Sequence, residues 1–329
     1  MTFSSFLIVE PDEFLASWFS SGVTERVKSL RSSDPQGPSV ASMLPHWRYS
    51  PWTLSESGFS ARVNLSSEFH TARLVRKECL SPSAQCFHVE FAFESGPDFR
   101  FLPGQFVSVV ASDPAGKEQT RAYSIASAHG SNRFDLCLNR VPGGFVSNHL
   151  CDLEIGETIR LYGPNGFFVL REPVTDSILI ATGTGIAPMR SFTQSLFSRG
   201  GMDRSGAKEV WLVHGTRNES DLYYREEFEA LAARCPNFHY FPTLSRADEG
   251  WRGLRGYVQD HAVGIIEERA VQFGTSLSSV VEGTSVAAPD LHFKMYAYVC
   301  GLSRMISSVR ERLKSLGLHR KQIVVERYD

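Results

Sequence analysis

The segment from residue 177 to residue 190 limits the possible folds of this chain more than any other. An apolar run at 177–182 leads into a turn with glycines at 183 and 185, and a helical pattern begins near Pro188. A strand, a tight loop and a helix start in this order are typical of a phosphate-binding turn. Glycines let the backbone approach a pyrophosphate, and the helix N-terminus attracts its charge. The alternative is a plain strand–turn–helix, since glycine-rich turns are common at this junction.

The length and composition indicate two domains. The chain has 329 residues, and single hydrophobic cores rarely grow beyond roughly 250–300 residues. A net charge of -2 gives no basic footprint for nucleic acid. No run approaches the ~18 apolar residues of a membrane span, and the first ten residues carry no basic leader. We therefore expect a cytoplasmic protein that binds no nucleic acid and has no membrane span.

The six cysteines stand at positions 79, 86, 137, 151, 235 and 300, without a CxxC motif or a tight cluster. This spacing argues against a cysteine-ligated iron–sulfur centre and against a disulfide framework. We expect no metal site.

The first half of the chain predicts an antiparallel barrel or sandwich. From about residue 61 to 172, short strands of alternating or wholly apolar residues are separated by clusters of Gly, Pro, Asp and Asn. The expected strands are 69–78, 86–93, 105–112, 119–125, 133–140 and 157–162, and a short helix is expected at 146–150.

From about residue 173, strands alternate with helices, which predicts a doubly wound parallel sheet. The expected strands are 177–182, 209–214, 238–244, 295–299 and 322–326, and the expected helices lie near 188–199, 221–234, 256–270 and 302–316. We expect an antiparallel β-barrel domain at 63–172 and an α/β domain at 173–329. The Ser-, Gly- and Ala-rich segment 276–289 is interpreted as a mobile insertion.

Residues 1–62 form an N-terminal extension whose role stays open. Two tryptophans and a tyrosine lie between prolines at 45–52. Because aromatic side chains anchor interfaces, this segment could dock a protein partner. The simpler interpretation is a tail packed over its own domain.

Four motifs in order together resemble the ferredoxin–NADP reductase family of flavoproteins. They are Arg121-Ala122-Tyr123-Ser124, the stretch 143–148, the glycine turn at 183–185 and the C-terminal stretch 324–328. The resemblance covers about residues 65 to 329. It implies a flavin-binding barrel followed by an NADP-binding α/β domain, with FAD bound non-covalently; FMN is the alternative flavin.

The first two motifs suit a flavin. Tyr123 can stack on the isoalloxazine, the Arg121 guanidinium can bind a pyrophosphate in a bidentate manner, and the Ser124 hydroxyl can bond near a ring nitrogen. A turn that opens a helix can present backbone amides to a phosphate. The resemblance places Gly143, Gly144, Val146 and Ser147 there. Taken singly, the two motifs could be an ordinary strand and an ordinary turn.

The resemblance places NADP(H) at the carboxyl ends of the parallel strands. In the plant-type members, a Ser-Arg pair and a following tyrosine hold the adenosine 2′-phosphate and the adenine. Ser245, Arg246 and Tyr257 match them, whereas an acidic residue at this strand end would favour NAD. The alternative for Arg246 is a solvated surface charge. The residues expected at NADP are Thr182, Gly183, Thr184, Gly185, Pro188, Gly215, Arg217, Ser245, Arg246, Tyr257, Gln259, Gly301 and Met305.

Four residues are expected to be catalytic by resemblance: Ser124, Cys300, Glu326 and Tyr328. The family places a cysteine beside the reacting nicotinamide carbon, a glutamate within reach of serine and cysteine, and a tyrosine over the flavin face. The plant-type chains stop at this tyrosine, whereas here Asp329 follows Tyr328. An added charge could alter how Tyr328 lies.

The expected function is hydride transfer from NADPH to FAD and reversible passage of single electrons to a separate carrier, ferredoxin or flavodoxin. The alternatives are the reductase component of an oxygenase system and a non-catalytic flavin-binding interaction module. An acidic carrier would need a basic patch near the flavin edge. The candidate residues are Arg62, Arg73, Arg76, Lys77, Arg121 and Arg140.

Overall fold

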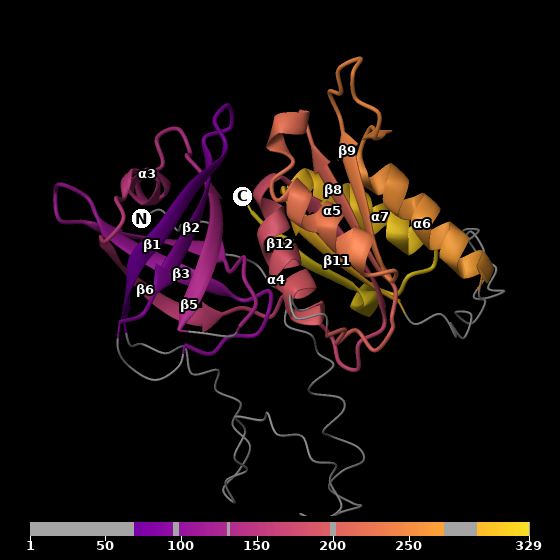
Figure 1. Cartoon of the computed structure of the whole chain (residues 1–329), viewed down its shortest axis with the longest axis horizontal. Coiled ribbons are helices and arrows are strands. Elements are labelled where there is room, and N and C mark those ends of the chain that lie inside the picture. Colours follow the sequence, from indigo (N-terminus) through magenta and orange to yellow (C-terminus); the bar gives the residue numbers. More distant parts are fainter. Residues whose placement is uncertain (1–68, 95–98, 130–131, 198–201, 273–294, 329) are drawn as a thin grey trace, which may run out of the picture. The chain divides into compact units, whose positions relative to one another are not determined.

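The computed structural model describes residues 69–94, 99–129, 132–197, 202–272 and 295–328, which form two six-stranded sheets (Figure 1). The N-terminal extension 1–62 and the segment 276–289 lie outside the described residues.

The first sheet is antiparallel, with strand order β4-β3-β6-β1-β2-β5. Its interior is lined by alternate residues such as Leu74, Val107 and Leu136, all fully buried. An isolated antiparallel bridge between Ile125 and Leu136 links the segment after β4 to β5, so the two edges meet and the sheet closes. The elements are β1 (His70–Ser81), β2 (Cys86–Ala92), β3 (Phe106–Ser112), β4 (Glu118–Ser124), β5 (Arg133–Asn139), α3 (Phe145–Asp152) and β6 (Thr158–Asn165).

The second sheet is parallel, with strand order β10-β9-β8-β7-β11-β12. Its strands are β7 (Asp176–Thr182), β8 (Val210–Thr216), β9 (Phe238–Leu244), β10 (Leu254–Arg255), β11 (Met295–Gly301) and β12 (Ile323–Arg327). Its helices are α4 (Ile186–Leu196), α5 (Arg225–Arg234), α6 (Val258–Gln272) and α7 (Ser303–Ser315), with short 3-10 turns η2 (Gly183–Gly185), η3 (Glu219–Asp221) and η4 (Arg320–Gln322).

Helices cover both faces of this sheet. Leu179 of β7 belongs to a buried cluster with Phe192 of α4 and Phe228 of α5. The next residue of the strand, Ile180, belongs to another cluster that includes side chains of α6 and α7. Because neighbouring residues of a strand point to opposite faces, α4 and α5 cover one face and α6 and α7 cover the other. This is the expected doubly wound arrangement, and the predicted fold class is confirmed.

The two sheets share a hydrophobic cluster. Phe168, which follows the last strand of the first sheet, packs against Phe192 of α4 with ring centroids 5.5 Å apart. Cys86, Ala126 and Cys137 from the first sheet lie in the same cluster. The cluster therefore places α4 against the barrel.

The strands and helices expected from the sequence are present, with ends that differ by a few residues. The clearest difference is α5, which begins at Arg225 and not near residue 221. Tyr224 has a φ of 60°, and a left-handed residue cannot continue a right-handed helix. The 3-10 turn η3 occupies the positions before it.

Candidate functional site

The predicted nucleotide residues lie along one edge of the parallel sheet. They lie at or after the carboxyl ends of β10, β9, β8, β7 and β11, which are neighbours in this order. Parallel strands end at a common edge, and ligands of open α/β sheets bind there. Segments far apart in the sequence thus meet in one row.

In the turn between β7 and α4, the two glycines are required for different reasons. Gly183 has a φ of 55°, and a Cβ built on it would meet nothing within 4 Å, so open space faces this residue. A Cβ on Gly185 would lie 2.4 Å from the Cys300 carbonyl oxygen. Gly185 therefore lets the turn approach the end of β11. The turn is the 3-10 turn η2 and leads directly into α4.

For several expected nucleotide residues, packing within the protein also explains the residue type. Pro188 is buried within α4. A Cβ on Gly215 would lie 2.4 Å from the Val258 side chain of α6. Gly301 has a φ of 150°, and a Cβ there would lie 2.4 Å from Thr182 Oγ1 and 2.7 Å from Met305 Cε. These residues shape the sheet edge by letting its parts approach closely.

The ends of β8 and β9 bring two arginines together. The Arg246 amide donates to the Arg217 carbonyl at 3.0 Å, and the Ser245 amide donates to Thr216 O at 2.9 Å. Ser245, Arg217 and Arg246 are exposed, and neither arginine forms an ion pair within the described residues. The pair can therefore receive an anion.

Tyr257 lies between β10, which ends at Arg255, and α6, and it is 63% exposed. Gln259, the second residue of α6, is half-buried. Arg255 differs from Arg246 because it donates to the carbonyl oxygens of Ala247, Asp248 and Trp251. Arg255 therefore holds the loop, and Arg246 stays available.

On β4, the three predicted flavin residues differ in exposure. Arg121 is exposed and donates only to Thr120 O, at 2.8 Å, within the described part of the chain. Tyr123 is half-buried, and burial raises the pKa of its hydroxyl. Ser124 is buried. The strand thus runs from solvent at Arg121 to the protein interior at Ser124.

The turn before α3 leaves its backbone accessible. Gly143 has a φ of 72° and open space around it. The Ser147 hydroxyl accepts from Val141 N and donates to Gly144 O, each at 3.3 Å, and Val146 is buried in the barrel core. The side chains of Val146 and Ser147 therefore serve the local structure, and the exposed glycine of this turn is Gly143.

Three of the four predicted catalytic residues meet at one carboxylate. Ser124 Oγ of β4 donates to Glu326 Oε2 of β12 at 2.7 Å, and Cys300 Sγ of β11 lies 3.8 Å from the same oxygen. Cys300 and Glu326 are direct neighbours in the parallel pairing of β11 with β12. The sheet register brings them together, and the barrel supplies the serine.

Burial governs the chemistry of this cluster. Glu326 is 2% exposed, and burial raises its pKa to about 7, although the hydrogen bonds from Ser124 and Cys300 act in the opposite direction. Burial and the nearby Glu326 raise the pKa of the Cys300 thiol. Near neutral pH the carboxyl group can therefore gain or lose a proton, whereas the thiol stays protonated.

Tyr328 lies next to the cluster. Its amide donates to the Gly301 carbonyl at 3.1 Å. The residue is half-buried, yet its hydroxyl oxygen is buried and has no hydrogen-bond partner in the described part of the chain. The accessible surface of Tyr328 thus comes from its ring and backbone. Asp329 lies outside the described residues.

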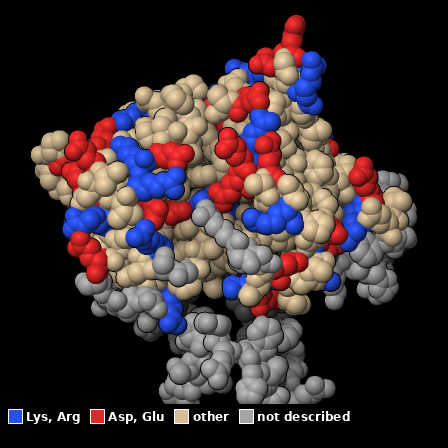
Figure 2. Space-filling view, viewed as in Figure 1, with Lys and Arg blue, Asp and Glu red and all other residues tan. Residues whose placement is uncertain are grey.

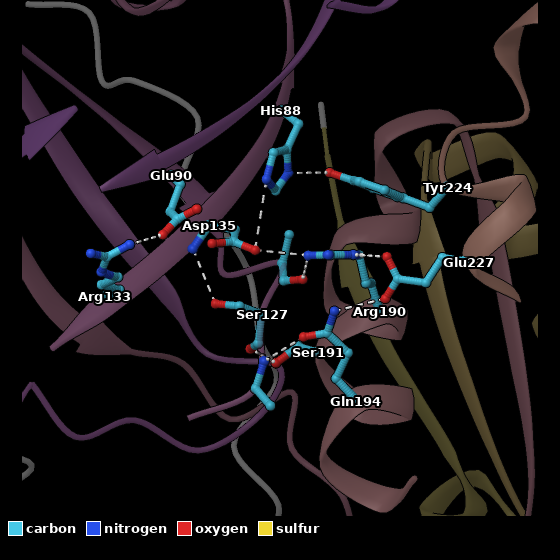
Figure 3. Close-up of polar contacts among 12 residues, drawn as sticks. His88, Glu90, Ser127, Arg133, Asp135, Arg190, Ser191, Gln194, Tyr224 and Glu227 are labelled. Carbon is cyan, nitrogen blue, oxygen red and sulfur yellow. Dashed lines mark hydrogen bonds and ion pairs between the residues drawn. The ribbon is translucent and has the colours of Figure 1, made fainter. Parts of the chain in front are cut away.

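The sequence reasoning missed a polar network around Arg190 that joins the two sheets (Figure 3). It also gave no role to His214, which is fully buried, has a pKa lowered by burial to about 3, and has no partner for Nε2 among the described residues. The only sequence signal for the network was an arginine within the apolar run of α4.

The predicted basic docking patch is not a free patch. Arg73 pairs with Glu94, Arg76 with Glu78 and Arg140 with Asp152, and Lys77 donates to the carbonyl oxygens of Cys151 and Leu153. On the face seen in Figure 2, Lys and Arg are interspersed with Asp and Glu. Of the predicted patch residues, Arg62 lies outside the described residues, and Arg121 has no acidic partner among them.

In the described part of the chain no three His, Cys, Asp or Glu side chains are arranged to hold a metal ion. All six cysteines are free. None of the described helices combines the length and the apolar character that crossing a membrane requires.

Comparisons with known proteins agree with this architecture. The family model for the oxidoreductase FAD-binding domain matches residues 71–170, and that for the oxidoreductase NAD-binding domain matches residues 179–311. Ferredoxin--NADP reductase B of Sorangium cellulosum (strain So ce56) is 41% identical over 271 residues, which are 80% of this chain and 100% of that protein. The chain belongs to the ferredoxin–NADP reductase family.

Two further relatives of this family show its breadth. The toluate 1,2-dioxygenase electron transfer component of Pseudomonas putida is 28% identical over 229 residues; the match spans 69% of this chain and 59% of that protein. A ferredoxin NADP+ reductase from Neisseria gonorrhoeae, solved with bound FAD and NADP, has a TM-score of 0.61 at 22% identity, covering 79% of this chain and 98% of that one. At this identity the solved structure supports the fold alone.

This chain is therefore an oxidoreductase of the ferredoxin–NADP reductase type, a flavoprotein with an FAD-binding and an NAD(P)-binding half. The predicted family, fold class and enzyme class are confirmed. The roles of individual site residues and the domain boundaries at 62 and 172 stay predictions.

Proposed function

We propose that this chain transfers hydride from NADPH to FAD and passes single electrons on to a separate carrier protein, ferredoxin or flavodoxin. The observation that carries the proposal is the Ser124–Glu326–Cys300 cluster. It joins the expected flavin strand to the strand ends where nicotinamide is expected, within hydrogen-bond distance of one carboxylate. When bound, FAD supplies the step from two-electron to one-electron transfer.

The residues of the barrel fit a flavin. Arg121 is an exposed cation without an acidic partner in the described residues, as a pyrophosphate requires. The open backbone around Gly143, at the turn that leads into α3, suits the second phosphate. Tyr123 and Tyr328 would hold the isoalloxazine between aromatic rings; both residues are half-buried.

The residues of the sheet edge fit NADP(H). The open Gly183 turn at the start of α4 would receive the pyrophosphate. Arg246, with Ser245 and Arg217 beside it, would bind the 2′-phosphate, and the exposed Tyr257 would stack on adenine. These contacts favour NADP(H) over NAD(H).

The catalytic cluster excludes water and holds a proton. Ser124, Cys300 and Glu326 are at most 5% exposed, and hydride transfer needs close approach in a site without water. The Glu326 carboxyl group contacts both the Ser124 hydroxyl and the Cys300 thiol. With its pKa near 7, it would take up and release a proton at this position. Cys300 stays neutral and would bring a small polarizable side chain against nicotinamide.

The carrier is proposed from the relatives. The Sorangium protein is named a ferredoxin--NADP reductase, so ferredoxin is our first candidate and flavodoxin the second. The Pseudomonas relative is named a dioxygenase electron transfer component, which supports an oxygenase component as the alternative acceptor. The free cysteines fit a reducing compartment such as the cytoplasm.

The test uses the purified full chain loaded with FAD and supplied with NADPH. Reduction of ferredoxin, flavodoxin or an oxygenase component is measured by coupled cytochrome c reduction. We expect turnover with ferredoxin or flavodoxin. Turnover with the oxygenase component alone would support the alternative acceptor, and absence of diaphorase activity with ferricyanide would contradict the proposal.

A further inference from the structure

Arg190 of α4 is a buried cation held by both halves of the molecule. Its side chain is 7% exposed. Nη1 donates to Ala126 O at 2.8 Å and to Asp135 Oδ2 at 2.9 Å, both in the first half, and Nε donates to Glu227 Oε2 of α5 at 2.7 Å (Figure 3). A buried charge is tolerated only when it is well paired. The two carboxylates raise the pKa of Arg190 above its ordinary value, although burial acts against this.

Two more residues of α4 bond to the same barrel segment. Ser191 Oγ donates to Ser127 O at 2.6 Å, and Gln194 Oε1 accepts from Ala128 N at 3.1 Å. Gln194 also donates to Glu227 at 2.7 Å. Three residues of one helix thus hold the three consecutive residues 126–128.

The partners of Arg190 are themselves fixed. The Tyr224 ring lies 4.6 Å from the Arg190 guanidinium carbon, and the Tyr224 hydroxyl is 3.0 Å from His88 Nδ1 of β2. His88 Nε2 lies 3.8 Å from Asp135. The network is therefore a closed set of contacts between β2, β5, α4 and α5, as Figure 3 shows.

The network is close in sequence to both cofactor motifs. Ala126 follows the flavin strand residue Ser124 by two positions. Arg190 follows Gly185 of the nucleotide turn by five, within the first turns of α4. Only a short stretch of backbone therefore separates the network from each motif.

We propose that Arg190 is a positioning residue for hydride transfer, fixing the nucleotide turn relative to the flavin strand through Asp135, Glu227 and Ala126. The inference rests on the proposed function, because it assumes that nicotinamide and flavin meet between these motifs. Arg190 itself touches neither motif's expected ligand. Hydride transfer is sensitive to such alignment, since a displacement of about 1 Å can cost on the order of 10²-fold in rate.

The test compares R190Q with a matched control, R269Q. Arg269 donates to Asp176 at 3.0 and 2.8 Å and lies 5.6 Å from the Trp211 ring. It is thus a partly buried arginine with a carboxylate and an aromatic partner, but these contacts lie within the parallel-sheet half. Each variant removes a well-shielded ion pair of an arginine, and of the two pairs only that of Arg190 joins the first half to the second.

Three readouts are measured on the FAD-loaded proteins. We expect R190Q to slow flavin reduction by NADPH by on the order of 10²-fold, with NADP+ affinity changed much less. The long-wavelength absorbance of the nicotinamide–flavin complex should weaken, and amide exchange at 126–128 should speed up. R190K, which keeps the charge without the planar fork, should recover part of the rate.

Equal rates and equal absorbance in R190Q and R269Q would overturn the proposal, because Arg190 would then act on stability alone. If R190Q does not fold, D135N and E227Q weaken the same network and are compared with D176N in the same way. A wild-type protein that NADPH does not reduce would instead overturn the proposed function. The amide exchange measurement needs no turnover and separates these two failures.

Discussion

The Ser124 hydroxyl and the Glu326 carboxylate lie 2.7 Å apart, although 202 positions separate them in the chain. The bond joins the end of an antiparallel strand to the last strand of a parallel sheet. Neither residue could be buried as a polar group without a partner. The fold thus brings the expected flavin strand and the expected nicotinamide strand ends together at the Glu326 carboxyl group, which can hold a proton.

The first prediction concerns the pH dependence of stability. Burial raises the pKa of Glu326 to about 7 from its ordinary value of 4.5. Between these values the folded protein binds a proton that the unfolded chain releases, so folding loses stability as pH rises through this range. E326Q lacks this loss. Relative to the wild type, its free energy of unfolding should therefore increase by about 3 kcal/mol as pH rises across this range.

Urea unfolding at several pH values between about 4 and about 8 measures this difference. E267Q, which replaces an exposed glutamate of α6, is the control and should follow the wild type. Parallel curves for E326Q and wild type would show that the Glu326 carboxyl group titrates normally.

The second prediction concerns the close approach at Gly185. A Cβ there would lie 2.4 Å from Cys300 O and 2.7 Å from Cys300 C, and backbone atoms cannot yield easily. Gly185→Ala should destabilise the protein by about 1–3 kcal/mol. Gly264→Ala in α6 meets no atom within 4 Å and should stabilise by up to about 1 kcal/mol. Thermal unfolding distinguishes them, and equal melting temperatures would refute the packing argument.

The third prediction concerns the choice of nucleotide. Loss of a charge-assisted bond costs about 1.5–3 kcal/mol. Arg246→Ala should therefore lower kcat/KM for NADPH by roughly tenfold to a hundredfold and leave that for NADH nearly unchanged. Arg252, exposed in the same loop, supplies the control variant R252A. Equal losses with both nucleotides would mean that Arg246 does not contact the 2′-phosphate.

The fourth prediction concerns Tyr328. If its ring covers the flavin face, it competes with nicotinamide for that position. Tyr328→Ser should then tighten NADP+ binding by about tenfold, the value of one aromatic stack. Difference spectroscopy measures the affinity. An unchanged Kd would argue against a stacking role.

Most of the fold could be predicted because local patterns determine it. The apolar run at 177–182 and the alternation of strands and helices after it gave both the parallel sheet and its ligand-binding edge. The start of α5 could not be predicted in this way. The left-handed backbone of Tyr224 belongs to the network with Arg190 and His88, which depends on tertiary contacts.

The candidate site likewise has a part that could be predicted from the sequence and a part that could not. The closeness of Cys300 and Glu326 was expected from the family resemblance, and the parallel pairing of β11 with β12 is its structural reason. The role of Arg190 could not be inferred, because its partners Asp135 and Glu227 stand 55 and 37 positions away and belong to no motif. The basic patch stays a prediction, but the pairing of three of its arginines with Glu78, Glu94 and Asp152 could not be inferred for a related reason.

The most direct test of the central claim is rapid mixing of the FAD-loaded protein with NADPH or NADH while flavin absorbance is recorded. The account predicts a yellow protein that NADPH bleaches faster than NADH does, because hydride transfer to FAD is proposed at the Ser124–Cys300–Glu326 cluster and Ser245 and Arg246 are proposed to bind the 2′-phosphate that NADH lacks. A protein that takes up no flavin, or a bound flavin that neither nucleotide reduces, would contradict it.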